Sequence, residues 1–134
     1  MSKLSMYCMA LNNDNLETIK SLNYIPVGLK NKDFSDEWLR DNTDENISEK
    51  NSFYGEYTFY YWYWKNLLKF KGDNEWVGFC SYREYWGSKK KDKSNKIGDI
   101  VLREYQPEWS NYDAIIGEPI SIGGTKLIKV LKYG

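Results

Sequence analysis

A strongly aromatic segment followed at once by an apolar run dominates the middle of this 134-residue sequence. Within residues 53–70, bulky side chains recur at intervals of three and four positions, which is the spacing of one helical face. We therefore predict a helix over residues 54–70, N-capped by Ser52 and stopped by Gly72. Its core-facing stripe is predicted to be Tyr57, Tyr60, Tyr61, Trp64, Leu67 and Leu68.

The run that follows is nearly continuous in apolar side chains and too short for a helix of its own. Such runs are typical of strands that are covered on both faces of a sheet. We therefore predict a central strand over residues 76–82, with the aromatic helix packed on the sheet beside it. Cys80 lies in this run and Cys8 in an earlier apolar segment, so both thiols are predicted to be buried and unreactive.

The first 28 residues predict a β-α-β unit. Residues 3–10 form an apolar run without a helical stripe, and residues 24–28 form a second one in which Pro26 indicates an edge or a strand end. Between them, Asp14 and Glu17 have the spacing of a capping box for a helix that ends near Leu22.

The rest of the chain continues the alternation of strands and helices. Residues 30–52 are polar, with one helical turn predicted at 35–39; residues 113–117 predict a further strand, and Thr125 would cap a final helix. This order favours an α/β fold with a mostly parallel sheet and helices on both faces. The length fits one domain over residues 1–134.

Composition excludes several functional classes. The chain has no His and two Cys, which excludes His-based triads and both His-ligated and Cys₄ zinc sites. Lys plus Arg equals Asp plus Glu at 19 each, which argues against a nucleic-acid partner, including RNA. No apolar segment is long enough to cross a membrane. Without a secretory signal, the two cysteines indicate reduced thiols, and we expect a cytoplasmic location.

Three blocks of the sequence, residues 46–51, 54–66 and 76–86, together resemble the family catalogued as domain of unknown function 4422. Segments 24–28 and 112–116 are similar to that family as well. Its members are regarded as glycosyltransferases of bacterial surface-polysaccharide synthesis. This chain differs in having Ser81 where the family usually has His and Glu84 where it has a second Arg.

The resemblance implies a Rossmann-like, GT-A-type fold of three α/β/α layers, with the ligand outside the carboxyl ends of the strands. It also implies a nucleotide-sugar donor and a saccharide acceptor. Family members continue beyond Gly134, so we expect the chain to form the donor-binding half. The final helix would then keep an apolar face for an oligomer or a partner chain.

Many GT-A enzymes hold a divalent cation with Asp-x-Asp at the end of a central strand, but this sequence contains no Asp-x-Asp. By analogy of fold, Tyr82, Arg83 and Glu84 stand at that place. An arginine can neutralise phosphate oxygens without a metal, so we predict that Arg83 contacts the diphosphate. The alternatives are an Arg83 paired with Glu84 or Glu49 on the surface, and a Mn²⁺ or Mg²⁺ ion held by Glu84 and Glu56.

Glu56 stands in the first turn of the aromatic helix, where the resemblance implies contact with the donor sugar. The alternative is a carboxylate that only stabilises the helix N-terminus. Lys50 would meet phosphate or remain solvated, and Trp86 would stack on a sugar or cover the core. With Glu56 and Arg83 as catalytic residues, the predicted substrate-binding residues are Asn46, Glu49, Lys50, Asn51, Tyr54, Tyr82, Glu84 and Trp86.

Two functional classes follow from these residues. The first is a glycosyltransferase, or the donor-binding part of one. The second is a non-catalytic domain that binds a sugar or a nucleotide, or serves only in interactions. The lysine-rich segment 89–96 is either a solvated loop or a contact for anionic lipid or polysaccharide, which would allow peripheral membrane contact.

Overall fold

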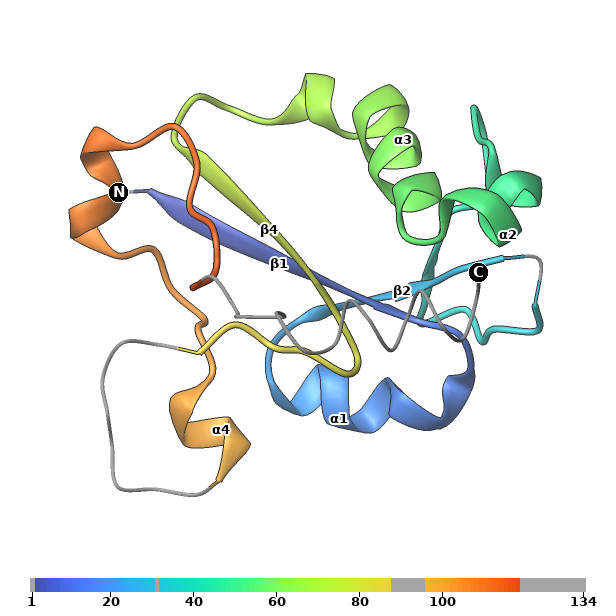
Figure 1. Cartoon of the computed structure of the whole chain (residues 1–134), viewed down its shortest axis with the longest axis horizontal. Helices are drawn as coiled ribbons and strands as arrows, with labels where there is room; N and C mark the ends of the chain where they lie inside the picture. The colour runs from blue at the N-terminus through green and yellow to red at the C-terminus, as the bar shows by residue number, and fades with distance from the viewer. Residues whose placement is uncertain (1, 31, 88–95, 119–134) are drawn as a thin grey trace, which may run out of the picture.

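The computed structural model describes residues 2–30, 32–87 and 96–118 (Figure 1). Its centre is a four-stranded sheet in the order β3-β2-β1-β4, in which every neighbouring pair is parallel. The strands are β1 (Lys3–Ala10), β2 (Ile25–Gly28), β3 (Leu39–Arg40) and β4 (Glu75–Ser81). This confirms the predicted α/β, Rossmann-like fold.

Helices cover both faces of the sheet, which gives three layers (Figure 1). One face carries the 3₁₀ helix η1 (Asn13–Asn15) and α1 (Leu16–Ser21), and the other carries α2 (Asn51–Tyr54) and α3 (Tyr57–Asn66). Short 3₁₀ helices flank this second pair, namely η2 (Ser48–Lys50) and η3 (Leu68–Phe70). After β4 come α4 (Ile97–Ile100) and the 3₁₀ helix η4 (Pro107–Asn111).

β1 contributes side chains to both hydrophobic cores because successive residues of a strand point to opposite faces. Met6, Cys8 and Ala10 pack with Ile19 and Leu22 on the α1 side. Tyr7 and Met9 pack on the α3 side, with a cluster made of Val27, Leu29, Phe59, Trp62 and Tyr63. Both cores therefore depend on one strand.

The predicted β-α-β unit is confirmed, with two local differences. The capping box of Asp14 and Glu17 does not form; the Asn12 side chain instead accepts a hydrogen bond from the Asp14 amide at 3.1 Å, at the start of η1. Pro26 lies in an inner strand and pairs with Cys8. Because β3 pairs only with Val27 and Gly28, Pro26 precedes the β3 ladder and lies near the strand end, as predicted.

The predicted helix over residues 54–70 contains α3, but it is not continuous, it ends at Asn66 rather than near Gly72, and its predicted buried face is wrong. Gly55, with φ 54° and ψ −129°, separates α2 from α3, and Ser52 is exposed within α2 rather than an N-cap. Tyr57 and Trp64 are 69% and 56% exposed, whereas the buried residues of α3 are Thr58, Phe59, Trp62 and Tyr63. The helix is aromatic on both sides, so spacing alone could not select the face.

β4 is not the central strand that its apolar run predicted. Within the described residues it pairs only with β1 and forms one end of the sheet. Its side chains are half-buried apart from the buried Cys80, which lies opposite Cys8 in the strand register. Both thiols are free and buried, as predicted, and the contact with Cys8 together with burial raises the pKa of Cys80.

Two further predicted elements differ. Residues 35–39 form a turn followed by β3 instead of a helical turn, and residues 113–117 do not form a strand. The predicted helix from Thr125 and the lysines between 89 and 93 lie outside the described residues. In the described part of the chain, none of the helices has the length and apolar character needed to span a bilayer.

Candidate functional site

A cleft of about 310 Å³ opens at the carboxyl ends of β1, β2 and β4, which all run toward the right-hand side of Figure 1, where α2 lies. The chain passes from β1 to β2 on one side, while β4 pairs with β1 on the other side. Open α/β sheets bind ligands at such a switch point. This switch-point cleft is lined by Met9, Ala10, Leu11, Leu29, Lys30, Asn51, Ser52, Gly55, Glu56, Ser81, Tyr82 and Arg83.

Backbone hydrogen bonds hold the three strand ends together. The Leu29 amide donates to the Ala10 carbonyl at 3.1 Å, and the Tyr82 amide donates to the Met9 carbonyl at 2.9 Å. The residues that follow, Lys30 and Arg83, therefore flank the end of β1 from opposite sides. Lys30 has φ 67°, in the left-handed region that a residue with a side chain seldom adopts.

The opposite wall of the cleft is fixed by a buried carboxylate. Asp41, directly after β3, has no exposed surface. It accepts hydrogen bonds from the Ser48 hydroxyl at 3.0 Å and from the Thr58 hydroxyl at 2.6 Å. A buried carboxylate needs such partners, since leaving it unpaired would be costly. Asp41 thus ties the loop after β3 to the first turn of α3.

The same network reaches the cleft through Asn51. Its side-chain amide donates to the Thr58 hydroxyl at 3.0 Å and to the Gly55 carbonyl at 2.7 Å, so it spans the break between α2 and α3. Gly55 adopts a positive φ that a larger residue would adopt only with strain. Glu56, the next residue, is exposed in the cleft wall and makes no side-chain bond that caps α3.

Arg83 is exposed and held by its neighbour. Its Nε donates to the Tyr82 hydroxyl at 2.9 Å, and its guanidinium carbon lies 5.2 Å from the centroid of the Tyr82 ring. No ion pair joins Arg83 to Glu49 or Glu84 in the part of the chain that the structure describes. The surface pair considered as an alternative is therefore not formed there.

The charges of the cleft suit an anionic ligand. Lys30 and Arg83 are its cationic lining residues, and Glu56 is its one carboxylate among the described residues. Burial and the nearby Glu56 raise the pKa of Tyr60. Among residues 2–30, 32–87 and 96–118, the structure shows no group of three acidic or thiol side chains that could hold a metal ion.

The structure brings together four of the ten predicted site residues in the cleft wall: Asn51, Glu56, Tyr82 and Arg83. Asn46 instead bonds within its own loop, where its side chain donates to the Asp44 carbonyl and accepts from the Ser48 amide. Trp86 donates to the Phe79 carbonyl at 2.8 Å and lines a different cavity. The other predicted residues outside the cleft are Glu49, Lys50, Tyr54 and Glu84.

Sequence reasoning missed three residues of this region. Lys30 was identifiable, because it follows a predicted strand at the edge where the ligand was expected. Asp41 and Thr58 carried no such signal. Asp41 stands in a polar segment that looked solvated, and Thr58 is one small residue in an aromatic helix.

Comparison with known protein families identifies one family over most of the chain. The model of the family described as "Domain of unknown function (DUF4422)" matches residues 5–129. No curated protein and no solved structure matches the chain. The match covers nearly the whole sequence and includes every residue that lines the switch-point cleft. The chain therefore belongs to the domain of unknown function 4422 family.

Proposed function

We propose that this chain binds a nucleotide-activated sugar in the switch-point cleft and acts as a glycosyltransferase, or as the donor-binding part of one. The observation that carries the proposal is the position of Arg83 and Lys30 on either side of the β1 end, with Glu56 in the opposite wall. The two cations match the diphosphate of a nucleotide sugar, and the carboxylate matches its hydroxyl-rich sugar ring.

The two cations would bind the diphosphate. Arg83 can offer a planar fork of N–H donors to phosphate oxygens, while Lys30 acts as a point charge. In sugar transfer, the bond between the anomeric carbon and the phosphate oxygen breaks, and negative charge develops on the diphosphate. Cations already in position stabilise that charge as it forms.

Glu56 would serve the sugar side of the reaction. A carboxylate accepts hydrogen bonds from sugar hydroxyls, and it can take the proton of the acceptor hydroxyl as that oxygen bonds to the anomeric carbon. Its position at the start of α3 is held by the Asn51 and Asp41 network. The acceptor would be a saccharide of polysaccharide synthesis. Nucleotide sugars are cytoplasmic metabolites, so we place this activity in the cytoplasm.

Calorimetry against a panel of UDP-, GDP-, dTDP- and CDP-sugars, with and without Mn²⁺, tests the proposal. We expect at least one donor to bind, and Arg83→Ala to weaken its binding by about tenfold or more, since charge-assisted bonds to phosphate are lost. Because Arg83 is exposed, the Arg83→Ala variant should unfold at the same thermal midpoint as the parent. Glu84→Ala is the matched control, being the next residue, exposed and outside the cleft.

The result against the proposal is an Arg83→Ala variant that binds every donor as the parent does, or a parent that binds none. A parent that binds a donor without transferring or hydrolysing it would favour the non-catalytic binding domain instead. Binding that requires Mn²⁺ would point to a metal ion held in part by Glu56 rather than to Arg83 alone.

A further inference from the structure

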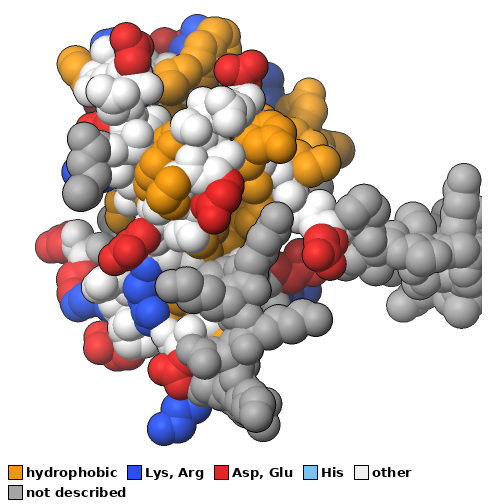
Figure 2. Space-filling view, turned by 90° about the vertical axis from the view of Figure 1, so that its left-hand side faces the viewer, with side chains coloured by type: hydrophobic (Ala, Val, Ile, Leu, Met, Phe, Trp, Pro, Cys, Tyr) orange, Lys and Arg blue, Asp and Glu red, His pale blue; other side chains and the backbone are white. Residues whose placement is uncertain are grey.

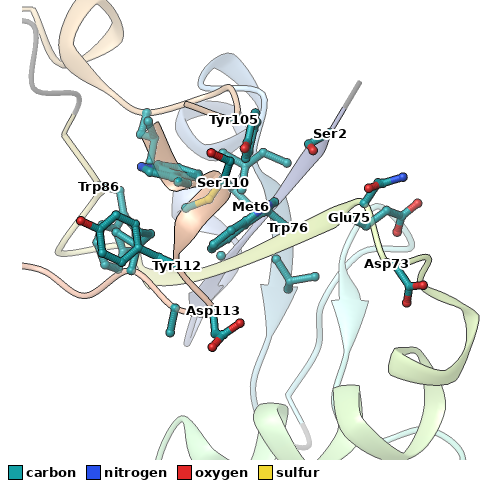
Figure 3. Close-up of a pocket in the computed structure, with 18 of the residues that line it drawn as sticks. Ser2, Met6, Asp73, Glu75, Trp76, Trp86, Tyr105, Ser110, Tyr112 and Asp113 are labelled. Carbon is teal, nitrogen blue, oxygen red and sulfur yellow. The ribbon is translucent and has the colours of Figure 1, made fainter. Parts of the chain in front are cut away.

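A second and larger cavity, of about 660 Å³, lies beside the amino-terminal half of β4 (Figure 3). It shares no lining residue with the switch-point cleft. Its floor comes from Ser2, Leu4 and Met6 and from residues 75–78 of β4, whereas the cleft uses the opposite ends of β1 and β4. We name it the β4-edge cavity.

Aromatic rings form one side of the β4-edge cavity. The Trp76 ring lies 5.4 Å from that of Trp109 and 6.1 Å from that of Tyr105, measured between centroids. Tyr105 and Trp109 meet edge to face at 5.8 Å. All three rings are half-buried, so each is held by its neighbours and still presents surface to the cavity. Figure 3 shows Tyr112 and Trp86 beside this cluster.

Three acidic side chains also line the cavity, and one of them, Glu75, forms an ion pair with Lys71 at 3.5 Å. Asp73 and Glu75 lie on one side of Trp76, and Asp113 lies on another (Figure 3). Neither lysine nor arginine occurs among the described residues that line it. On the face of the molecule that Figure 2 shows, acidic and hydrophobic side chains lie side by side. This lining disfavours a phosphate-bearing ligand, in contrast to the cationic switch-point cleft.

We propose that the β4-edge cavity binds an uncharged saccharide. One face of a pyranose ring presents only C–H groups, which pack on the flat side of a tryptophan or tyrosine ring. Its hydroxyl groups are donors, and the carboxylates of Asp73 and Asp113 are acceptors of the matching kind. A volume of about 660 Å³ lies in the range of small-ligand sites and exceeds that of one sugar ring.

The position of the cavity adds a role to the proposed function without depending on it. A saccharide bound there lies at the opposite end of β1 and β4 from the switch-point cleft. It would therefore be bound without taking part in the reaction. A glycan of several residues could be retained in this way while its end is presented elsewhere. Binding of the saccharide requires no nucleotide, so the two proposals can fail separately.

Saturation-transfer NMR and calorimetry with maltotriose, cellotriose and triacetylchitotriose test the inference in the absence of nucleotide. We expect at least one trisaccharide to bind with a Kd below about 10 mM. Trp109→Ala should weaken that binding by about tenfold or more, because the stacking surface is lost. The matched control is Trp64→Ala, which removes an exposed tryptophan of α3 that does not line the cavity.

Asp113→Asn keeps the test decisive if Trp109→Ala lowers stability. Asp113 is exposed, so its amide variant should keep the thermal midpoint while weakening saccharide binding. Arg83→Ala should leave saccharide binding unchanged. The inference is overturned if none of the three sugars binds, if Asp113→Asn and Trp109→Ala bind them as the parent does, or if the cavity takes choline in their place, because aromatic rings with carboxylates also bind cations.

Discussion

The carboxylate of Asp41 accepts a 2.6 Å hydrogen bond from the hydroxyl of Thr58, across 17 positions of sequence. Both residues have no exposed surface. The bond joins the end of β3 to the first turn of α3, and through Asn51 it fixes the junction that carries Glu56. Asp41 lines neither the switch-point cleft nor the β4-edge cavity, yet it sets the shape of one wall of the switch-point cleft.

Replacing Asp41 with Ala should lower the free energy of unfolding by about 3 kcal/mol, because it removes two hydrogen bonds to a buried carboxylate and leaves the buried Ser48 hydroxyl without an acceptor. Urea denaturation measures the loss. Glu49→Ala, which removes an exposed carboxylate within η2, is the control and should change stability by less than about 0.5 kcal/mol. Equal effects of the two substitutions would show that the Asp41 network is not stabilising.

The buried face of α3 can be tested with two aromatic residues. Phe59→Ala should cost about 3–5 kcal/mol, since Phe59 is fully buried against Tyr7 and Phe79. Trp64→Ala should cost less than about 1 kcal/mol, because Trp64 is exposed and its described ring contacts are with the Lys65 ammonium and the edge of the Tyr61 ring. Thermal or urea unfolding of both variants decides which face of α3 is buried. A larger loss of stability in Trp64→Ala than in Phe59→Ala would support the buried face predicted from the sequence.

Alkaline pH should destabilise the fold through Tyr63. Its buried hydroxyl has no hydrogen-bond partner among the described residues, and burial raises its pKa from 10.0 to about 12. Between these two values the unfolded chain releases the proton and the folded chain keeps it, so the free energy of unfolding falls as pH rises from 10.0 to about 12.

Tyr63→Phe should make this alkaline decline smaller without removing it, because burial also raises the pKa of Tyr24. It should raise stability at pH 7 by about 1 kcal/mol, because it removes a buried polar group that gains no bond. Denaturation at several pH values between 8 and 12 measures both effects. Tyr54→Phe, at an exposed tyrosine, is the control and should leave the pH profile as it is. An unchanged decline in Tyr63→Phe would mean that another buried group, such as Tyr24, controls it.

Lys30→Gly separates the charge of Lys30 from its backbone conformation. Glycine adopts a φ of 67° without strain, but it also costs more conformational entropy on folding. Stability should therefore change by less than about 1 kcal/mol, while the affinity for a nucleotide sugar falls with the loss of the charge. Calorimetry measures the affinity, and Lys32→Gly, at an exposed lysine outside the cleft, is the control. Unchanged affinity would remove Lys30 from the proposed site.

The sequence predicted the strands near 3–10, 24–28 and 76–82 because their apolar runs are short and bounded by turns. It could not rank the two sides of α3, since Phe59 and Trp64 are equally apolar and only packing against Tyr7 distinguishes them. Nor could it tell an end strand from a central one. In β4 the covering residues come partly from Tyr105 and Trp109, which are distant in sequence.

The cleft was predictable only where a residue follows a strand. Arg83 was expected at the end of β4 and lines the cleft, and Lys30 occupies the equivalent place after β2. The polar residues before the aromatic helix, Asn46, Glu49, Lys50 and Asn51, were expected to bind the substrate together. In the structure, Asn51 turns inward to the Asp41 network while Asn46 bonds within its own loop. Side-chain direction in a loop depends on such tertiary hydrogen bonds, which sequence spacing does not encode.

The alternation of β1 between two cores has a consequence for how the molecule opens. Met6 and Cys8 belong to one core, and Tyr7 and Met9 to the other. A fluctuation that releases α1 or α3 alone leaves this strand paired on both sides, with β2 and with β4. The amide hydrogens of β1 should therefore exchange with solvent only when the whole domain unfolds, at the rate set by its global stability. The two layers of helices are thus coupled into one cooperative unit by eight residues of strand.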